Sequence, residues 1–116
     1  MPNSVQITTA FENKYKRLVK KFVSLENEID ELIIKLLDNP TLGTSLGAGL
    51  YKIRLASKSK GGGKSGGFRV ITYLVSEADE DNSIYLITIF DKSEQDSVDK
   101  KQLLEIVKKL FDAPPL

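Results

Sequence analysis

The sequence predicts a small α+β domain in which an antiparallel sheet packs on an N-terminal helical hairpin and is followed by a C-terminal helix. Apolar residues recur at helical spacing through residues 9–38 and again through 100–111. Between them lie three segments that alternate in polarity or are rich in β-branched and aromatic residues, joined by short connections that favour antiparallel pairing. The expected order is β-α-α-β-β-β-α, in one domain that covers residues 1–116.

The N-terminal third is expected to form a short strand, residues 5–8, and two amphipathic helices. Thr9 followed by Glu12 has the capping-box spacing, so Thr9 is the expected N-cap of the first helix. Ser24 is the expected cap of the second, and an Asn-Pro pair at 39–40 should end it. The apolar faces comprise Phe11, Tyr15, Leu18, Val19 and Phe22, then Leu25, Ile29, Leu32, Ile33 and Leu36.

The remaining chain is expected to supply the sheet and the last helix. Residues 41–49 are rich in glycine, serine and threonine, which is typical of a loop. Three strands are expected, at residues 50–57, 67–75 and 84–90, with an acidic turn at 77–83 before the last of them. The final helix is expected at residues 100–111.

Composition excludes several kinds of site. The chain has 116 residues, of which 41% are hydrophobic and 28% charged, as in ordinary globular proteins. It contains no cysteine and no histidine, which excludes disulfides, thiolate metal sites and histidine chemistry. No apolar run approaches the roughly 18 residues of a membrane span, and the first residues are not expected to act as a signal peptide. A cytoplasmic protein without metal or cofactor is expected.

Charge is distributed unevenly along the chain. The net charge is +1, from 17 basic and 16 acidic residues. Residues 39–76 contain six basic residues and no acidic one, so the rest of the chain, with 11 basic and 16 acidic residues, carries −5. A basic segment of this kind predicts either an anion-binding surface or a solvated basic hairpin beside an acidic segment.

The glycine-rich run inside this segment is not a nucleotide-binding P-loop. Gly63-Lys64-Ser65 matches the end of that motif, but Lys58 stands where its first glycine should be. A P-loop also leads into a helix, whereas this run leads into the strand-like sequence FRVITYLV. A loop between two strands is therefore expected.

Four elements of the sequence stand out when they are taken together. They are Lys52-Ile53-Arg54, the loop that ends in Ser65-Gly66-Gly67, the strand Arg69-Val70-Ile71-Thr72-Tyr73, and Phe90-Asp91-Lys92-Ser93-Glu94. In this order and at this spacing they resemble the RelE/HigB branch of the RelE/ParE toxin superfamily. The resemblance implies the RelE-type α+β fold and a type II toxin that cuts mRNA in the ribosomal A site. It also implies a separate antitoxin, which covers the toxin and connects it indirectly to operator DNA.

Arg69 is the first candidate for catalysis. It follows the glycine pair on the strand expected at the centre of the sheet. Because arginine is permanently charged and can donate two hydrogen bonds to one phosphate, Arg69 is expected to stabilise the scissile phosphate. The alternative is a structural ion pair with Asp91 or Glu94.

Lys52 and Arg54 are the next candidates. Alternation places both on one side of a strand whose other side is apolar, about 7 Å apart, so they could straddle adjacent phosphates. Without the resemblance, an ordinary solvent-exposed face would be the preferred explanation.

The resemblance adds Lys92, in a segment where the family often has a basic residue, although Ser93 stands where some members have arginine. Some members also use a tyrosine near the C-terminus, and this chain has none after Tyr85. Tyr73 and Glu94 are possible acid–base groups, against packing in the core and an exposed turn as the alternatives. With no histidine, proton transfer would fall to such groups or to Lys52.

Three lysines of the glycine-rich segment, Lys58, Lys60 and Lys64, are expected to bind RNA backbone from flexible chain, in a salt-dependent way. Two alternatives to a nuclease remain. One is a ParE-like poison of DNA gyrase, and the other is an RNA-binding or interaction module of the same fold with weak catalysis.

Overall fold

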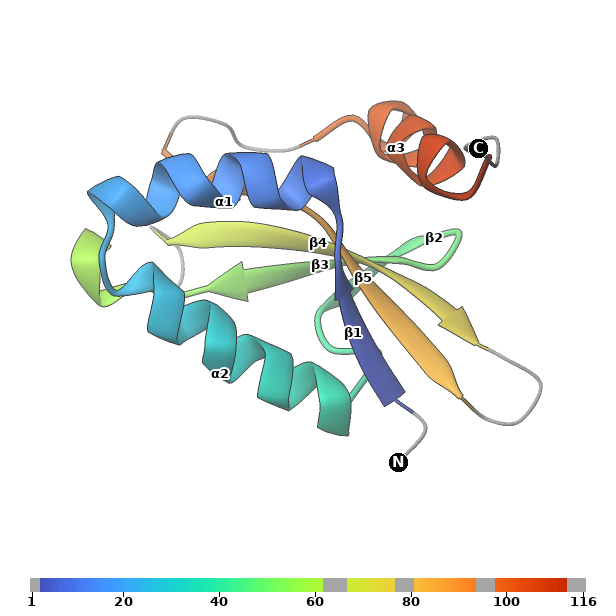
Figure 1. The fold of residues 1–116 in the computed structure, drawn as a ribbon, viewed down its shortest axis with the longest axis horizontal. Coiled ribbons are helices and arrows are strands. Elements are labelled where there is room, and N and C mark those ends of the chain that lie inside the picture. Colours follow the sequence, from blue (N-terminus) through green and yellow to red (C-terminus); the bar gives the residue numbers. More distant parts are fainter. Residues whose placement is uncertain (1–2, 62–66, 77–80, 94–97, 113–116) are drawn as a thin grey trace.

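A five-stranded mixed sheet with helices on both faces forms the fold (Figure 1). The structure is a computed structural model that describes residues 3–61, 67–76, 81–93 and 98–112. The elements are β1 (Asn3–Ile7), α1 (Thr9–Lys21), α2 (Leu25–Asp38), β2 (Thr44–Gly47), β3 (Leu50–Leu55), a 3-10 turn η1 (Lys58–Lys60), β4 (Phe68–Ser76), β5 (Asn82–Asp91) and α3 (Lys100–Asp112).

The three expected strands form the antiparallel meander β3-β4-β5, which confirms that part of the prediction. The complete order is β1-β5-β4-β3-β2. The sheet is not wholly antiparallel, however, because β1 lies beside β5 in parallel, from Asn3 opposite Asn82 to Ile7 opposite Leu86. The helical hairpin α1–α2 follows β1 and provides a long connection to the rest of the sheet, so β1 can lie parallel to its neighbour β5.

Two segments expected to be loop or turn are partly strand. Residues 44–47 form β2, which pairs with the first half of β3. The tight reversal between the two strands places Gly47, Ala48 and Gly49 at positive φ, which explains the glycines that made the segment resemble a loop. At the acidic turn, β5 begins at Asn82, two residues before the predicted start; residues 77–80 lie outside the described ranges.

The helices occupy the predicted segments, but their N-termini are built differently. Thr8, not Thr9, is the N-cap of α1, and its side chain accepts a 3.2 Å hydrogen bond from the backbone N–H of Phe11. The Thr8 hydroxyl also donates to the carbonyl oxygen of Leu86 at 2.7 Å, so the cap joins α1 to β5. Ser24 is the N-cap of α2 as predicted, but its side chain makes no capping hydrogen bond. Its hydroxyl instead donates to the Glu28 carboxylate and accepts from the Ser59 hydroxyl.

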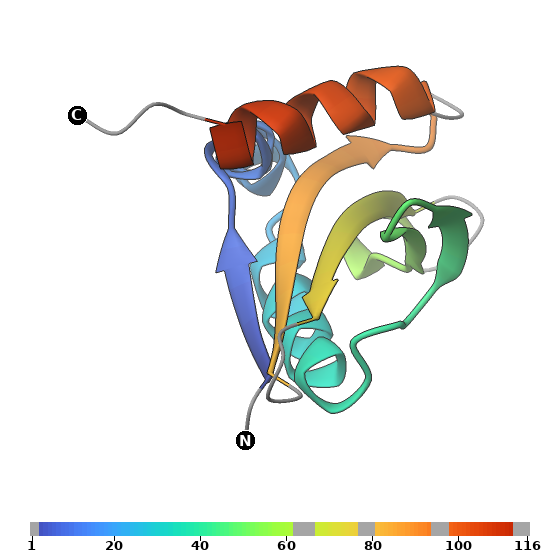
Figure 2. The same ribbon diagram turned by 90° about the vertical axis from the view of Figure 1, so that its right-hand side faces the viewer.

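Two hydrophobic cores cover the two faces of the sheet. The first lies under α1 and α2, whose buried side chains pack on one face of β3, β4 and β5. The second lies under α3, where Leu103 and Val107 pack on Leu50, Ile71 and Phe90. Figure 2 shows β5 curving along its length, so that its last part approaches α3. With both faces covered, the central strands β4 and β5 are buried or half-buried almost throughout.

Candidate functional site

A cluster of cations lies on the α3 side of the sheet. Arg54 of β3 and Arg69 of β4 are directly opposite each other, so their side chains extend from the same face. Lys52 lies two residues before Arg54 on the same side of β3, opposite Ile71. The structure thus brings together three sequence-predicted candidates, and we call Lys52, Arg54 and Arg69 the basic face.

The two arginines differ in their exposure to solvent. Arg54 is exposed, whereas Arg69 is only 4% exposed, and one of its guanidinium nitrogens, Nη1, donates to the carbonyl oxygen of Phe68 at 3.2 Å. Guanidinium groups bind phosphate oxygens through paired N–H donors, so a strand pair that carries two arginines beside a lysine suits phosphate.

The second core adjoins the basic face. Ile71, opposite Lys52, and Phe90, opposite Arg69, both belong to the cluster packed under α3. Hydrophobic packing therefore fixes the backbone from which the cations extend. A site on packed strands holds its groups more accurately than one on a loop.

Lys92 follows β5 at the end of the sheet where β4 begins. Its backbone N–H donates to the carbonyl oxygen of Gly67 at 3.1 Å, and Gly67 lies two residues before Arg69. Position 67 lies close to β3 and requires glycine, because a Cβ there would collide with the carbonyl oxygen of Leu55. Lys92 and Arg69 are thus held at the same end of the sheet.

The three predicted RNA-binding lysines do not share one environment. Lys58 is exposed on η1. The expectation of flexible backbone does not hold for Lys60, whose ammonium group forms an ion pair with Asp91 and whose side chain is 10% exposed. Lys64 lies outside the described residues.

The two possible acid–base groups are placed as follows. Tyr73 is half-buried and packs against the second core, with its ring centroid 5.8 Å from that of Phe111. This agrees with the alternative of core packing for Tyr73. Glu94 lies outside the described residues.

A basic groove that the sequence analysis did not identify lies between α1 and the end of β5. Its lining includes Lys14, Arg17 and Lys21 of α1 and residues 89–91, and its volume is about 380 Å³. The signal that could have identified it is the i, i+3, i+7 spacing of the three cations, which places them on one face of the helix. We call this feature the α1 groove.

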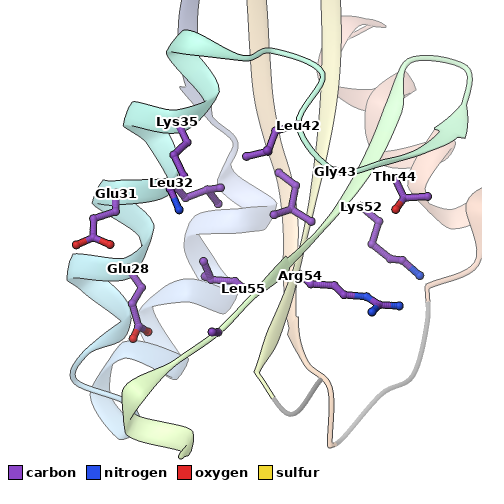
Figure 3. A pocket seen from close by; sticks show the side chains of 12 residues that line it. Glu28, Glu31, Leu32, Lys35, Leu42, Gly43, Thr44, Lys52, Arg54 and Leu55 are labelled. Atoms are coloured by element: carbon purple, nitrogen blue, oxygen red, sulfur yellow. The ribbon is translucent and has the colours of Figure 1, made fainter. Parts of the chain in front are cut away.

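A larger groove, of about 560 Å³, lies between α2 and β3 (Figure 3). Figure 3 shows Leu55 extending from β3 toward α2, whereas Lys52 and Arg54 extend away from it. Although Lys52 and Arg54 border this groove, their charged ends belong to the other face of the sheet. The larger groove is therefore separate from the basic face.

Two further observations concern the described part of the chain. Within it, no group of three or more potential metal-ligating side chains comes together. None of the helices found there has the length and apolar character needed to cross a membrane.

The fold and the basic face define a small α+β protein with a cationic sheet surface suited to phosphate. Comparison with known proteins identifies the group. The family model described as "RelE toxin of RelE / RelB toxin-antitoxin system" matches residues 8–113. The chain therefore belongs to the RelE toxin family, the toxin partner of a toxin–antitoxin pair.

A solved structure has the same fold. It is a double arginine-to-alanine mutant of the Escherichia coli toxin RelE in the free state. The match has a TM-score of 0.55 and 13% sequence identity, and it covers 96% of this chain and 99% of the other. The likeness confirms the predicted RelE-type α+β fold.

Proposed function

We propose that residues 1–116 form one toxin domain that cleaves mRNA in the ribosomal A site without a metal or cofactor. The observation that carries this proposal is the basic face, where an exposed and a buried arginine oppose each other beside a lysine. The sequence resemblance implies mRNA as the substrate, and the family model's description supports the role of a toxin. The protein would act in the cytoplasm and be neutralised by its cognate antitoxin.

RNA cleavage by internal attack makes three chemical demands. The ribose 2′-oxygen loses its proton and bonds to phosphorus, negative charge grows on the phosphate oxygens, and the bond to the 5′-oxygen breaks as that oxygen gains a proton. The products are a 2′,3′-cyclic phosphate and a free 5′-hydroxyl, so neither water nor an oxidant is consumed. Positioned cations meet the second demand.

We assign roles to the cations by their positions. Arg69, held by the sheet, stabilises the charge on the scissile phosphate. Lys52 and Arg54 hold the neighbouring phosphates and favour ionisation of the 2′-hydroxyl through their field. Lys92 contributes positive charge at the leaving-group end. Tyr73 and Glu94 remain candidates for proton transfer, and Lys58 and Lys64 for contacts with RNA backbone.

Purified ribosomes programmed with a short mRNA provide the test. We expect wild-type protein to cut the mRNA within the A-site codon, and to leave the same mRNA uncut when ribosomes are absent. Arg54→Ala should slow the cut without changing its position, because the exposed Arg54 contributes charge but little packing. Lys109→Ala, which removes a cation from the exposed side of α3, is the control and should cut normally.

Absence of cleavage in that assay would contradict the proposal. The gyrase-poison alternative would then be examined by adding purified gyrase and supercoiled DNA and measuring double-strand breaks. Ribosome or RNA binding with neither activity would instead identify a non-catalytic module.

A further inference from the structure

An enclosed ion pair lies at the base of the glycine-rich segment. The Lys60 ammonium group contacts the Asp91 carboxylate, and the two side chains are 10% and 4% exposed. The same carboxylate oxygen accepts hydrogen bonds from the backbone N–H and the hydroxyl of Ser93, at 2.9 and 2.8 Å. Asp91 therefore holds both Lys60 and the chain that follows β5.

The ammonium group of Lys60 is enclosed by other groups, unlike that of an exposed lysine that binds RNA. Its ammonium nitrogen lies 5.0 Å from the ring centroid of Phe68 and 5.7 Å from that of Phe22. It also lies 3.4 Å from the carbonyl oxygen of Gly67. Two aromatic rings, a carboxylate and a carbonyl oxygen thus surround the charge, so binding a phosphate would require breaking this arrangement.

The ion pair connects the ends of three strands that carry the proposed catalytic cations. Lys60 ends η1, which follows β3, and Gly67 immediately precedes β4. Asp91 is the last residue of β5 and lies opposite Phe68. Because Arg69 is two residues from Gly67 and Lys92 is next to Asp91, a shift of this contact would move both cations.

The backbone that carries Lys60 is itself anchored to the helical hairpin. The Ser59 hydroxyl donates to the Ser24 hydroxyl oxygen at 2.7 Å, and the Ser59 N–H donates to the same oxygen at 3.0 Å. The Lys58 N–H donates to the Glu28 carboxylate at 2.8 Å. These bonds hold η1 against the start of α2, so the backbone of Lys60 is fixed relative to the hairpin.

We infer that Lys60 and Asp91 are positioning residues for RNA cleavage, whose ion pair sets the spacing of Arg69 and Lys92 without touching RNA. The inference rests on the proposed nuclease function. It assigns Lys60 a role different from that of exposed Lys58, although both lie on η1. Displacing a catalytic group by about 1 Å can slow a reaction by roughly 100-fold.

The test separates binding from catalysis on programmed ribosomes. A double variant, Lys60→Met with Asp91→Asn, removes both charges but keeps an oxygen that can accept from Ser93. We expect its single-turnover cleavage rate at saturating protein to fall by about 10- to 100-fold, with a ribosome Kd within about twofold of wild type. The single variant Lys60→Arg, which retains the charge, should keep most of the wild-type cleavage rate.

Two comparison variants give contrasting results. Lys58→Ala, on the exposed part of η1, should raise the Kd for ribosomes. Asp91→Glu keeps both charges but lengthens the carboxylate side chain by one methylene. A positioning role predicts that this folded variant cleaves about 10-fold more slowly than wild type, so the inference remains testable even if the double variant does not fold.

Each contrary outcome has a distinct meaning. Wild-type cleavage rates in the folded double variant, or in Asp91→Glu, would show that the pair only stabilises the fold. A raised Kd with an unchanged saturated rate would show that Lys60 binds RNA. Either result would overturn the inference alone, whereas failure of the wild-type protein to cut would overturn the proposed function with it.

Discussion

The two arginines of the basic face differ in how the sheet holds them. Arg69 is 4% exposed, and its Nη1 donates to the carbonyl oxygen of Phe68, whereas Arg54 is exposed. Arg69 is therefore the more firmly positioned of the two charges, as a group that stabilises a phosphate must be.

Gly67 is expected to be the glycine least tolerant of substitution near the site. In Gly67→Ala the new methyl group would collide with the Leu55 carbonyl oxygen, so the start of β4 must move away from β3. We expect a loss of about 1–3 kcal/mol in the free energy of unfolding, measured by urea denaturation, together with slower cleavage.

Gly61→Ala is the matched control for that substitution. A Cβ at Gly61 has no atom within 4 Å, and only the positive φ of 93° opposes it. It should therefore cost no more than about 1–2 kcal/mol and leave β4 in place. Equal slowing of cleavage by the two substitutions would contradict the close approach of Gly67 to β3.

The ionisation of Asp91 predicts how stability depends on pH. Burial acts to raise the pKa of Asp91, but hydrogen bonds from Lys60 and Ser93 and the charge of Lys60 outweigh burial and lower it below its ordinary value of 3.8. A depressed carboxyl pKa stabilises the fold at pH values above the unfolded pKa, and the stabilisation is lost as pH falls through the folded pKa.

The stability difference between wild type and Asp91→Asn should therefore be full at about pH 6 and shrink below about pH 4. Urea denaturation at a series of pH values measures it. A difference that stays constant down to pH 3 would mean that Asp91 is not ionised in a stabilising contact.

At the scale of elements, the cap of α1 connects the helix to the sheet. Thr8→Ala removes the bond to Phe11 and the bond from the Thr8 hydroxyl to Leu86, and should cost about 1–2 kcal/mol in the free energy of unfolding. Thr9→Ala, at an exposed helical position, should change stability by less than about 0.5 kcal/mol. A larger loss in the free energy of unfolding for Thr9→Ala than for Thr8→Ala would instead indicate that Thr9 is the cap.

Patterns within single elements predicted both helices of the hairpin, the meander, α3 and the shared face of Lys52 and Arg54. They failed where contacts join distant residues. Pairing of β1 with β5 joins segments far apart in the chain, as the Thr8–Leu86 bond between residues 78 apart shows. Likewise, the Lys60–Asp91 ion pair joins residues 31 apart, and no local signal distinguishes Lys60 from Lys58.

For the whole molecule, near-neutral net charge conceals a strongly asymmetric surface. Besides the basic face, the α1 groove places three cations beside the end of β5. If RNA backbone follows this groove, the triple variant Lys14→Ala, Arg17→Ala, Lys21→Ala should bind ribosomes more weakly. Its slope of log affinity against log salt should be shallower by about 2, since each phosphate contact contributes about 0.7.

A matched triple variant on α3, Lys101→Ala, Lys108→Ala, Lys109→Ala, removes the same charge from exposed positions away from the groove. It should leave the slope nearly unchanged. Equal effects of the two triple variants would mean that overall charge, not the α1 groove, governs association.

Mapping of mRNA 5′ ends in a translating bacterial extract tests the central claim most directly. Wild-type protein should create new ends inside A-site codons, and these ends should require ribosomes and disappear with Arg69→Ala, whose folded state is checked by thermal melting. No new ends, at protein concentrations matching those that stop growth in cells, would contradict the assignment of this chain as a ribosome-dependent endoribonuclease.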